Sequence, residues 1–396
     1  MSAPHDQLDA ATRAAGRWPA RGEIWLILAY ALTAAFVTWQ ALHLGHIDNF
    51  LIFRWSFFHL SEGVNLYAPY PKLYFSLYQY GPSFGLLIAP FALPPVWLGL
   101  VLFNSVNITV FYIAVRRLLP GRLGLVALVL LYFEVLRTAQ NAQNNALLAG
   151  LMILGFLWLE RDRLGRAAAA IALGASFKIF PLAAAALALP HRRRMRFGLF
   201  LAAALAALLL APLLLTSAST LLQQYRWWGE AEQGFGTRRL DSVMALFALV
   251  VPGTWPNWPV QAAGTALVLL PFLLRRADWG DPIFRRGMLY SVLVYVVLFN
   301  HQAESPTFII AMTGVVAWYL TVERRWYHHA VMAASWVLVS LFSEILSGDA
   351  LNACCRPWHY KTIPILLAWL VMQWELLAPR RPGGALPGRA GDAPAP

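Results

Sequence analysis

The stretch FGLFLAAALAALLLAPLLLT, residues 197–216, contains no charged residue and decides the fold. A run of roughly 17–25 apolar residues crosses the hydrocarbon core of a bilayer as one helix. Similar apolar blocks recur along the chain at residues 24–39, 96–115, 288–299 and 331–342. These blocks lack the two-residue alternation of apolar and polar side chains that is typical of membrane β-barrels. The sequence therefore predicts an all-α, polytopic helical membrane protein.

The composition agrees with this class. Of the 396 residues, 59% are hydrophobic and only 13% are charged, whereas about 25% of the residues of a soluble protein are charged. The net charge of +12 would indicate nucleic-acid binding in a soluble chain. Here the basic residues lie between apolar blocks, so we expect no nucleic-acid partner. Cys354 and Cys355 are adjacent and form neither a disulfide framework nor a metal site.

The basic residues also predict the topology, because Lys and Arg accumulate in cytoplasmic loops. They gather in short clusters within residues 13–21, 116–122, 161–166, 192–196, 275–286, 324–325 and 380–381. If every cluster lies inside, the chain makes about twelve crossings and both termini are cytoplasmic. We expect residues 1–22 to be a cytoplasmic tail, residues 23–380 the membrane domain, and the Gly/Pro/Ala-rich residues 381–396 a disordered cytoplasmic tail.

Two of the outer segments are long enough to fold on the membrane surface. The first, residues 43–83, combines aromatic with apolar side chains, which is typical of helices that lie in the interface. The second covers residues 216–241. We therefore predict interfacial helices in the first outer loop. Residues 241–274 fit a broken or re-entrant helix followed by one crossing.

Residues 167–190 are too short for two full crossings and lie between Arg166 and Arg192. A hairpin keeps both arginines inside, but each arm then has about 12 residues, or roughly 18 Å of helix. The hydrocarbon core is roughly 30 Å thick. Lys178 and Pro181 would occupy the tip, where non-helical backbone must line protein or a water-filled cavity. The sequence predicts an outward-open cavity with an ammonium group at its floor.

Charged residues in or near the membrane are functional candidates, because each is costly there. Asp48 directly follows the first span, and its carboxylate can accept a proton from a hydroxyl. Asp48 is alternatively an N-cap for a helix that starts at Asn49. Lys178 can bind a phosphate as a point charge, or it can snorkel toward the interface.

Three further outer segments carry polar candidates. Gln143 and Asn144 lie in the amide-rich turn TAQNAQNNALL, where they can bind sugar hydroxyls or a phosphate, or simply cap helices. His301 can donate to a phosphate and Glu304 can orient His301 or the acceptor, unless both belong to a plain polar turn. Arg226, in the second long outer segment, can neutralise an anionic ligand or contact lipid headgroups.

Missing motifs narrow the chemistry. No paired acid stands near Asp48, so a divalent metal site is not indicated. The sequence has no GxGxxG or P-loop, and no cofactor is expected. Any substrate is then expected to arrive from the bilayer or from outside.

The order of these elements is familiar. Asp48 is followed by EGVNLY (62–67), YGPSFGLLIAPFALPP (80–95), QNN (143–145) and GASFKIFPL (174–182). This order resembles the GT-C membrane glycosyltransferases and, among them, the polyprenol-phosphate-mannose-dependent mannosyltransferases of glycosyltransferase family 87. The resemblance covers roughly residues 24–380.

The resemblance implies a GT-C-like helical bundle with a cavity that opens outward. It also implies inverting, metal-independent transfer of a sugar, often mannose, from a polyprenyl-phosphate donor. By residue match, Asp48 would be the general base and Lys178 the lysine of the short hairpin. Many relatives have Tyr-Pro-Pro where this chain has Tyr80-Gly81-Pro82, which leaves the fold intact but leaves the donor and acceptor open. Tyr80 itself is counted among the substrate-binding candidates.

Together with the topology, the resemblance implies a hexosyltransferase of the plasma (inner) membrane, with its active site facing outside. Its partners would be a polyprenyl-phosphate-linked sugar donor, a lipid or glycan acceptor, and membrane lipids. The alternative is a membrane transporter or a flippase for lipids or polyprenyl phosphate, since an intramembrane lysine beside a cavity fits that class too. Transporters commonly have internal repeats, and none is visible here. A non-catalytic scaffold is the third reading.

Overall fold

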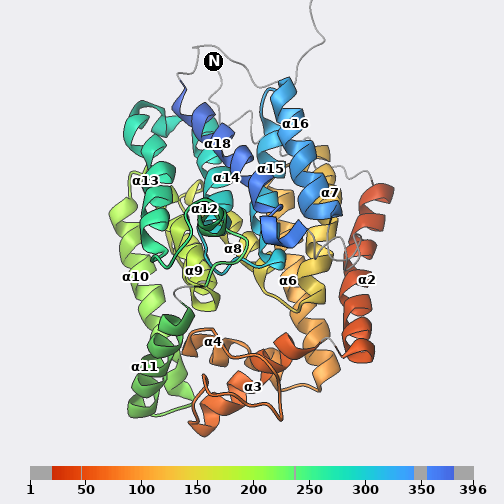
Figure 1. Cartoon of the computed structure of the whole chain (residues 1–396), viewed down its shortest axis with the longest axis vertical. Coiled ribbons are helices and arrows are strands. Elements are labelled where there is room, and N and C mark those ends of the chain that lie inside the picture. The colour runs from red at the N-terminus through yellow and green to blue at the C-terminus, as the bar shows by residue number, and fades with distance from the viewer. Residues whose placement is uncertain (1–19, 46, 236–237, 343–354, 379–396) are drawn as a thin grey trace, which may run out of the picture.

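The computed structural model describes residues 20–45, 47–235, 238–342 and 355–378 (Figure 1). Within these ranges the regular secondary structure is helical, without any strand, which confirms the predicted all-α class. Most of the two predicted tails, much of the last outer turn and Cys354 lie outside the described residues.

The helices follow one another closely along the chain. In order they are α2 (Ala20–Leu44), α3 (Asp48–Glu62), α4 (Pro82–Leu87), α5 (Ala89–Ala92), α6 (Val96–Leu118), α7 (Arg122–Gln140), α8 (Asn145–Leu159), α9 (Leu164–Phe177), η1 (Phe180–Ala188), α10 (Arg194–Leu210), η2 (Ala211–Leu214), α11 (Ala218–Phe235), α12 (Val243–Val250), α13 (Trp258–Leu274), η3 (Arg276–Gly280), α14 (Pro282–Leu298), η4 (Ser305–Thr307), α15 (Phe308–Thr321), α16 (Trp326–Ser335), η5 (Trp336–Leu341), η6 (Arg356–Trp358) and α18 (Thr362–Leu377).

Four described segments are long and apolar enough to cross a membrane by themselves: Gly22–Leu44, Val96–Leu118, Arg122–Gln140 and Arg194–Leu214. Further apolar helices of 10–17 residues, such as α8 and α15, lie among them. The chain is therefore a polytopic membrane protein. The count of about twelve crossings stays a prediction, because the shorter helices do not reach full span length on their own.

The helices differ in how much apolar surface they expose. Nearly every residue of α8 and α15 is buried, as expected for helices that are hydrophobic all round and lie inside a bundle. The outer helices α2 and α10 instead expose large apolar side chains, among them Trp25, Trp39 and Leu199. Such a surface suits contact with lipid tails.

Small residues allow the inner helices to approach closely. A Cβ added at Gly150 of α8 would lie 3.1 Å from the backbone oxygen of Val110 in α6. One added at Gly314 of α15 would lie 2.7 Å from the backbone oxygen of Tyr290 in α14. Small residues at helix contacts are a common means of tight packing in membranes.

Most of the described arginine clusters lie at one end of the bundle, where α2 begins and α18 ends, at the top of Figure 1. Arg116 at the end of α6 pairs with Glu23 of α2 at 2.8 Å. Arg285 of α14 pairs with Glu160, the residue that follows α8 in the chain, at 2.7 Å. Helices α3, α4 and α11 gather at the opposite end (Figure 1).

The predicted short hairpin is formed by α9 and the 3-10 helix η1, with Lys178 between them. Its base is closed by an ion pair between Arg193 and Asp162. Near its tip, a Cβ on Gly174 would lie 3.1 Å from the Cβ of Pro181, so a glycine permits the close approach of the two arms. The 14 residues of α9 span roughly 21 Å, less than the roughly 30 Å of hydrocarbon.

The segment 241–274 is broken as expected. The eight-residue α12 ends at Val250 and the 17-residue α13 begins at Trp258. In the segment predicted as the first outer loop, α3 ends at Glu62 and is capped by Gly63, whose φ of 72° is left-handed. Val64 N–H donates to the His59 carbonyl and Gly63 N–H to the Leu60 carbonyl, which is the Schellman pattern that favours glycine.

Candidate functional site

The amide-rich turn between α7 and α8 has an unusual backbone. Ala142 adopts a left-handed φ of 46°. Its N–H donates to the Ala139 carbonyl at 2.9 Å, and Gln143 N–H donates to the Thr138 carbonyl at 3.0 Å. This is a Schellman motif with alanine in the position where glycine is usual, and left-handed backbone costs alanine about 1–2 kcal/mol. The turn directs Gln143 and Asn145 toward the hairpin tip.

Lys178 is held by this turn. Its Nζ donates to Gln143 Oε1 at 3.1 Å and to Asn145 Oδ1 at 3.0 Å. Asn145 Nδ2 also donates to Gln143 Oε1 at 2.9 Å, which ties the two amides together. The ammonium group is thereby fixed at the tip of the hairpin rather than left to snorkel.

Two more predicted residues complete the cluster. Gln143 Nε2 donates to Glu304 Oε2 at 2.8 Å, and Lys178 Nζ lies 5.8 Å from the centre of the Tyr80 ring, within the range of a cation–π contact. Glu304 is exposed, while Gln143 is buried. Residues from four distant segments thus converge on one ammonium group.

This arrangement leaves Lys178 with an N–H donor that can bind a ligand. An ammonium has three N–H donors, and two of them go to Gln143 and Asn145. The third can point at an oxygen of an anionic ligand. A carboxylate lies within electrostatic reach, since Glu304 interacts with Lys178, so the cluster can balance the charge of the lysine when no ligand is bound.

The rings around Tyr80 connect the hairpin to α3. Tyr80 stacks on Phe84 at 4.7 Å between ring centres. Phe84 meets Phe177 edge to face at 5.2 Å, one residue before the lysine. Phe53 of α3 contacts both Tyr80 and Phe84 at 5.0 Å. The aromatic contacts therefore fix the hairpin tip against α3 and the residues around Tyr80.

Asp48 lies at the same end of the molecule, at the start of α3. Its neighbour Asn49 donates from Nδ2 to the Asn141 carbonyl in the amide turn at 2.9 Å. The Asp48 carboxylate accepts the backbone N–H of Phe75 at 2.7 Å and of Ser76 at 3.2 Å. A carboxylate has about four acceptor positions, so about two remain for a hydroxyl. The N-cap alternative does not hold, because Ile47 is the N-cap and makes no side-chain cap bond.

The structure does not bring the predicted Asn144 or Arg226 into contact with Lys178. Asn144 is fully buried, and neither its Nδ2 nor its Oδ1 has a hydrogen-bond partner among the described residues. Arg226 is exposed on α11; Trp228, which faces Gly81, is two positions away and therefore on a different side of the helix. The roles of Asn144 and Arg226 stay predictions.

His301 belongs to a neighbouring group of contacts. Its Nδ1 lies 3.3 Å from Gln261 Nε2 and its Nε2 lies 3.3 Å from Gln302 Nε2. Burial lowers its pKa below the usual value, which favours the neutral ring at neutral pH. The expected orientation of His301 by Glu304 is not found: Glu304 bonds to Gln143 instead. Its part in phosphate binding stays a prediction.

Sequence reasoning missed two contacts at or beside the site. Asn145, rather than Asn144, contacts the lysine; the repeated amides of the turn were the available signal. Lys361, which is 3% exposed, donates to Ser305 Oγ next to Glu304. The sequence offered no signal for this contact, because the two residues are far apart in the chain.

Metal ligands do not cluster in the part of the chain that the structure describes, where no group of three or more His, Cys, Asp or Glu side chains could hold an ion. The cluster around Lys178 is built from an ammonium, amides, a phenol ring and one carboxylate. Such a set is suited to hold an anion beside polar, hydroxyl-rich ligands.

Comparison with known proteins identifies the family. The sequence model of glycosyltransferase family 87 matches residues 78–300, more than half of the chain. The matched region contains Tyr80, the amide turn and Lys178, whereas Asp48 and Glu304 lie outside it. A search of curated proteins finds no match. The chain therefore belongs to glycosyltransferase family 87 and is a membrane glycosyltransferase.

Proposed function

We propose that the protein transfers a hexose, such as mannose, from a polyprenyl-phosphate donor to a lipid or glycan acceptor. The observation that carries this proposal is the placement of Lys178. Gln143 and Asn145 fix it at the tip of a hairpin whose helical arm α9 is too short to cross the membrane. A lysine is a suitable ligand for a phosphate whose sugar-bearing end lies near the membrane surface.

The arginine clusters support the orientation. Most of those described lie at the end of the bundle opposite α3 and α11, and basic residues favour the cytoplasmic side. We therefore place both termini in the cytoplasm and the lysine cluster on the extracytoplasmic side of the plasma membrane. The donor would enter from the bilayer, with its phosphate at Lys178.

The proposed chemistry is a single inverting displacement without a metal. The Asp48 carboxylate takes the proton from the acceptor hydroxyl, whose oxygen forms the new bond to the anomeric carbon. The bond from that carbon to the phosphate oxygen breaks on the opposite face. The polyprenyl phosphate departs as a stable anion, so no acid is needed to protonate it, and Lys178 stabilises its charge.

Replacing Lys178 with methionine tests the donor site directly. The variant keeps most of the length of the side chain and removes its charge and its N–H donors. We expect kcat/KM for the donor to fall about 10²–10³-fold, because one electrostatic contact to the leaving group is lost. The assay follows transfer from a radiolabelled polyprenyl-phosphate mannose by purified protein in detergent, where no gradient exists to drive a transporter.

The acceptor serves as the internal comparison for this variant. If Lys178 binds the donor phosphate, KM for the acceptor changes much less than kcat/KM for the donor. Equal losses for both substrates would remove Lys178 from the phosphate site. Absence of transfer by the wild-type protein with any polyprenyl-phosphate hexose would overturn the proposed donor class.

Replacing Gln143 with leucine should weaken use of the donor, because Gln143 holds Lys178 in place. The variant removes the bonds from Gln143 to Lys178 and to Glu304. A hydrogen bond to a charged group contributes about 1.5–3 kcal/mol, so we expect donor kcat/KM to fall about 10- to 100-fold. The matched control is Gln140→Leu in the same turn, whose amide bonds to Gln40 at 2.8 Å. An equal loss in the control would indicate a general defect of the turn.

A further inference from the structure

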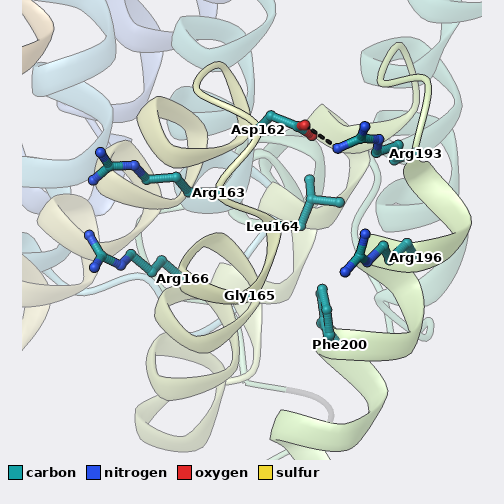
Figure 2. Close-up of a pocket in the computed structure, with 8 residues that line it drawn as sticks. All are labelled: Asp162, Arg163, Leu164, Gly165, Arg166, Arg193, Arg196 and Phe200. Atoms are coloured by element: carbon teal, nitrogen blue, oxygen red, sulfur yellow. Dashed lines mark hydrogen bonds and ion pairs between the residues drawn. The ribbon is translucent and has the colours of Figure 1, made fainter.

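A pocket of about 460 Å³ lies at the base of the hairpin, between the start of α9 and the start of α10 (Figure 2). It is lined by Asp162, Arg163, Leu164, Gly165, Arg166, Arg193, Arg196 and Phe200. Lys178 follows the last residue of α9, so the pocket and the lysine lie at opposite ends of a helix of roughly 21 Å. The pocket is therefore separate from the sugar-transfer site.

The pocket is strongly basic. Four of its lining residues are arginines and one is an aspartate. Asp162 pairs with Arg193, whereas Arg163, Arg166 and Arg196 have no ion pair among the described residues. In Figure 2, Arg193 and Arg196 point from the α10 side toward α9, and Arg163 and Arg166 extend from the other side of the first turn of α9. The guanidinium groups of Arg193 and Arg196 thus face the pocket. Those of Arg163 and Arg166 lie on the far side of the first turn of α9 and make the electrostatic potential of the pocket more positive.

Two helices also begin at this pocket. Helix α9 starts after Arg163 and α10 starts after Arg193, and neither has a side-chain cap bond. The first N–H groups of a helix and its dipole favour an anion at that position. The helix starts therefore add to the attraction of the arginines.

The remaining wall is apolar and continues into a membrane-facing surface. Leu164 and Phe200 line the pocket, and the Arg196 guanidinium lies 5.5 Å from the centre of the Phe200 ring. Beyond it, α10 exposes Met195 and Leu199 at 79% and 72%. Of the four long apolar segments, the one that contains α10 is the least buried. A ligand in the pocket would have its charge at the arginines and its apolar part along α10.

We propose that this pocket binds the phosphate of an anionic membrane phospholipid, with Arg193 and Arg196 as its ligands and α10 along its acyl chains. The alternative is that these arginines only set the topology of the protein. That role would not require a pocket, two helix starts at the pocket or an apolar wall beside it. The site is independent of the donor and acceptor chemistry at Lys178.

The test uses the full-length protein in nanodiscs of phosphatidylcholine with 10% phosphatidylglycerol. After gentle extraction, native mass spectrometry counts the lipids that stay bound. A basic side chain near an anionic membrane contributes roughly a fivefold preference. We expect the wild type to retain phosphatidylglycerol, Arg196→Gln to retain about fivefold less, and Arg193→Gln with Arg196→Gln about thirtyfold less. Arg196→Gln alone leaves the Asp162–Arg193 ion pair in place.

The control removes two arginines elsewhere, Arg117→Gln with Arg122→Gln, which are both exposed, one in the last turn of α6 and one at the start of α7. This pair should retain phosphatidylglycerol as the wild type does. An equal loss in the control, or no preference of the wild type for phosphatidylglycerol over phosphatidylcholine, overturns the proposal. A separate arm adds 10 mM inorganic phosphate: displacement of the lipid would show a site for free phosphate and also overturn the assignment to a lipid.

Discussion

Replacing Asp48 with asparagine is expected to lower the rate of sugar transfer by about 10²–10⁴-fold, the usual contribution of a general base. The substitution keeps the size of the side chain and removes its ability to accept a proton. Donor binding should change little, because the phosphate is assigned to Lys178. The measurement is transfer from the polyprenyl-phosphate sugar at saturating donor and acceptor, combined with donor affinity by equilibrium binding.

The Asp48 carboxylate also binds the backbone of the loop at residues 75–76. Its effect on this loop must therefore be distinguished from its proposed role in proton transfer. Asp48 accepts the N–H of Phe75 and of Ser76. Ser76→Pro removes one of these donors without touching the carboxylate. If this variant loses as much activity as Asp48→Asn, the acid acts by holding the loop and is not the base. If it keeps most of its activity, the loss in Asp48→Asn reports on proton transfer.

Replacing Arg137 with methionine is expected to destabilise the fold by about 3–5 kcal/mol, the cost of breaking a buried ion pair from one side. Arg137 and Glu134 of α7 are 2% and 0% exposed, and their side chains meet at 2.9 Å. Arg137 also donates to the Val339 carbonyl at 2.9 Å, which joins α7 to η5. The variant leaves the Glu134 carboxylate in an apolar interior without its nearest cation.

Unfolding of purified protein in mixed detergent micelles, followed by circular dichroism, measures this loss. The double variant Glu134→Gln with Arg137→Met removes both charges, and replacing a buried pair by neutral groups is often close to neutral in stability. We therefore expect the double variant to recover most of the lost stability. A double variant as unstable as Arg137→Met alone would show that the bond to Val339 matters more than the charge pair.

The hairpin of α9 and η1 could be predicted because two independent features agreed. Arginines flank the segment on both sides, and its length falls short of two crossings. The structure adds what the sequence does not encode by pattern. The second arm is a 3-10 helix, and Asp162 closes the base by pairing with Arg193. Neither an arm's helix type nor a partner 31 residues away follows from apolar periodicity.

The candidate site was predictable by residue type more than by position. Lys178, Gln143 and Glu304 were expected from their chemistry and Tyr80 from the family resemblance, and the structure brings the four together. Asn145 rather than Asn144 contacts the lysine, in a turn where Ala142 has a left-handed backbone. Since alanine rarely adopts that backbone conformation, the residues of the turn do not indicate it.

Residues on one outer segment need not face one site. Glu304 and His301 are three residues apart, yet Glu304 bonds to Gln143 and His301 lies beside Gln261 and Gln302. Arg226 shares α11 with Trp228 and lies on another side of that helix. Sequence proximity predicts a shared loop, but the direction of each side chain depends on packing against distant helices.

The lysine cluster has a consequence for biosynthesis. Its members come from positions 80, 143–145, 178 and 304 of the chain. A ribosome makes the lysine long before the glutamate, and contacts between such distant segments form only after both have been inserted. The nascent protein therefore lacks a complete lysine cluster through most of translation and gains it only after the segment around residue 304 has been inserted and folded.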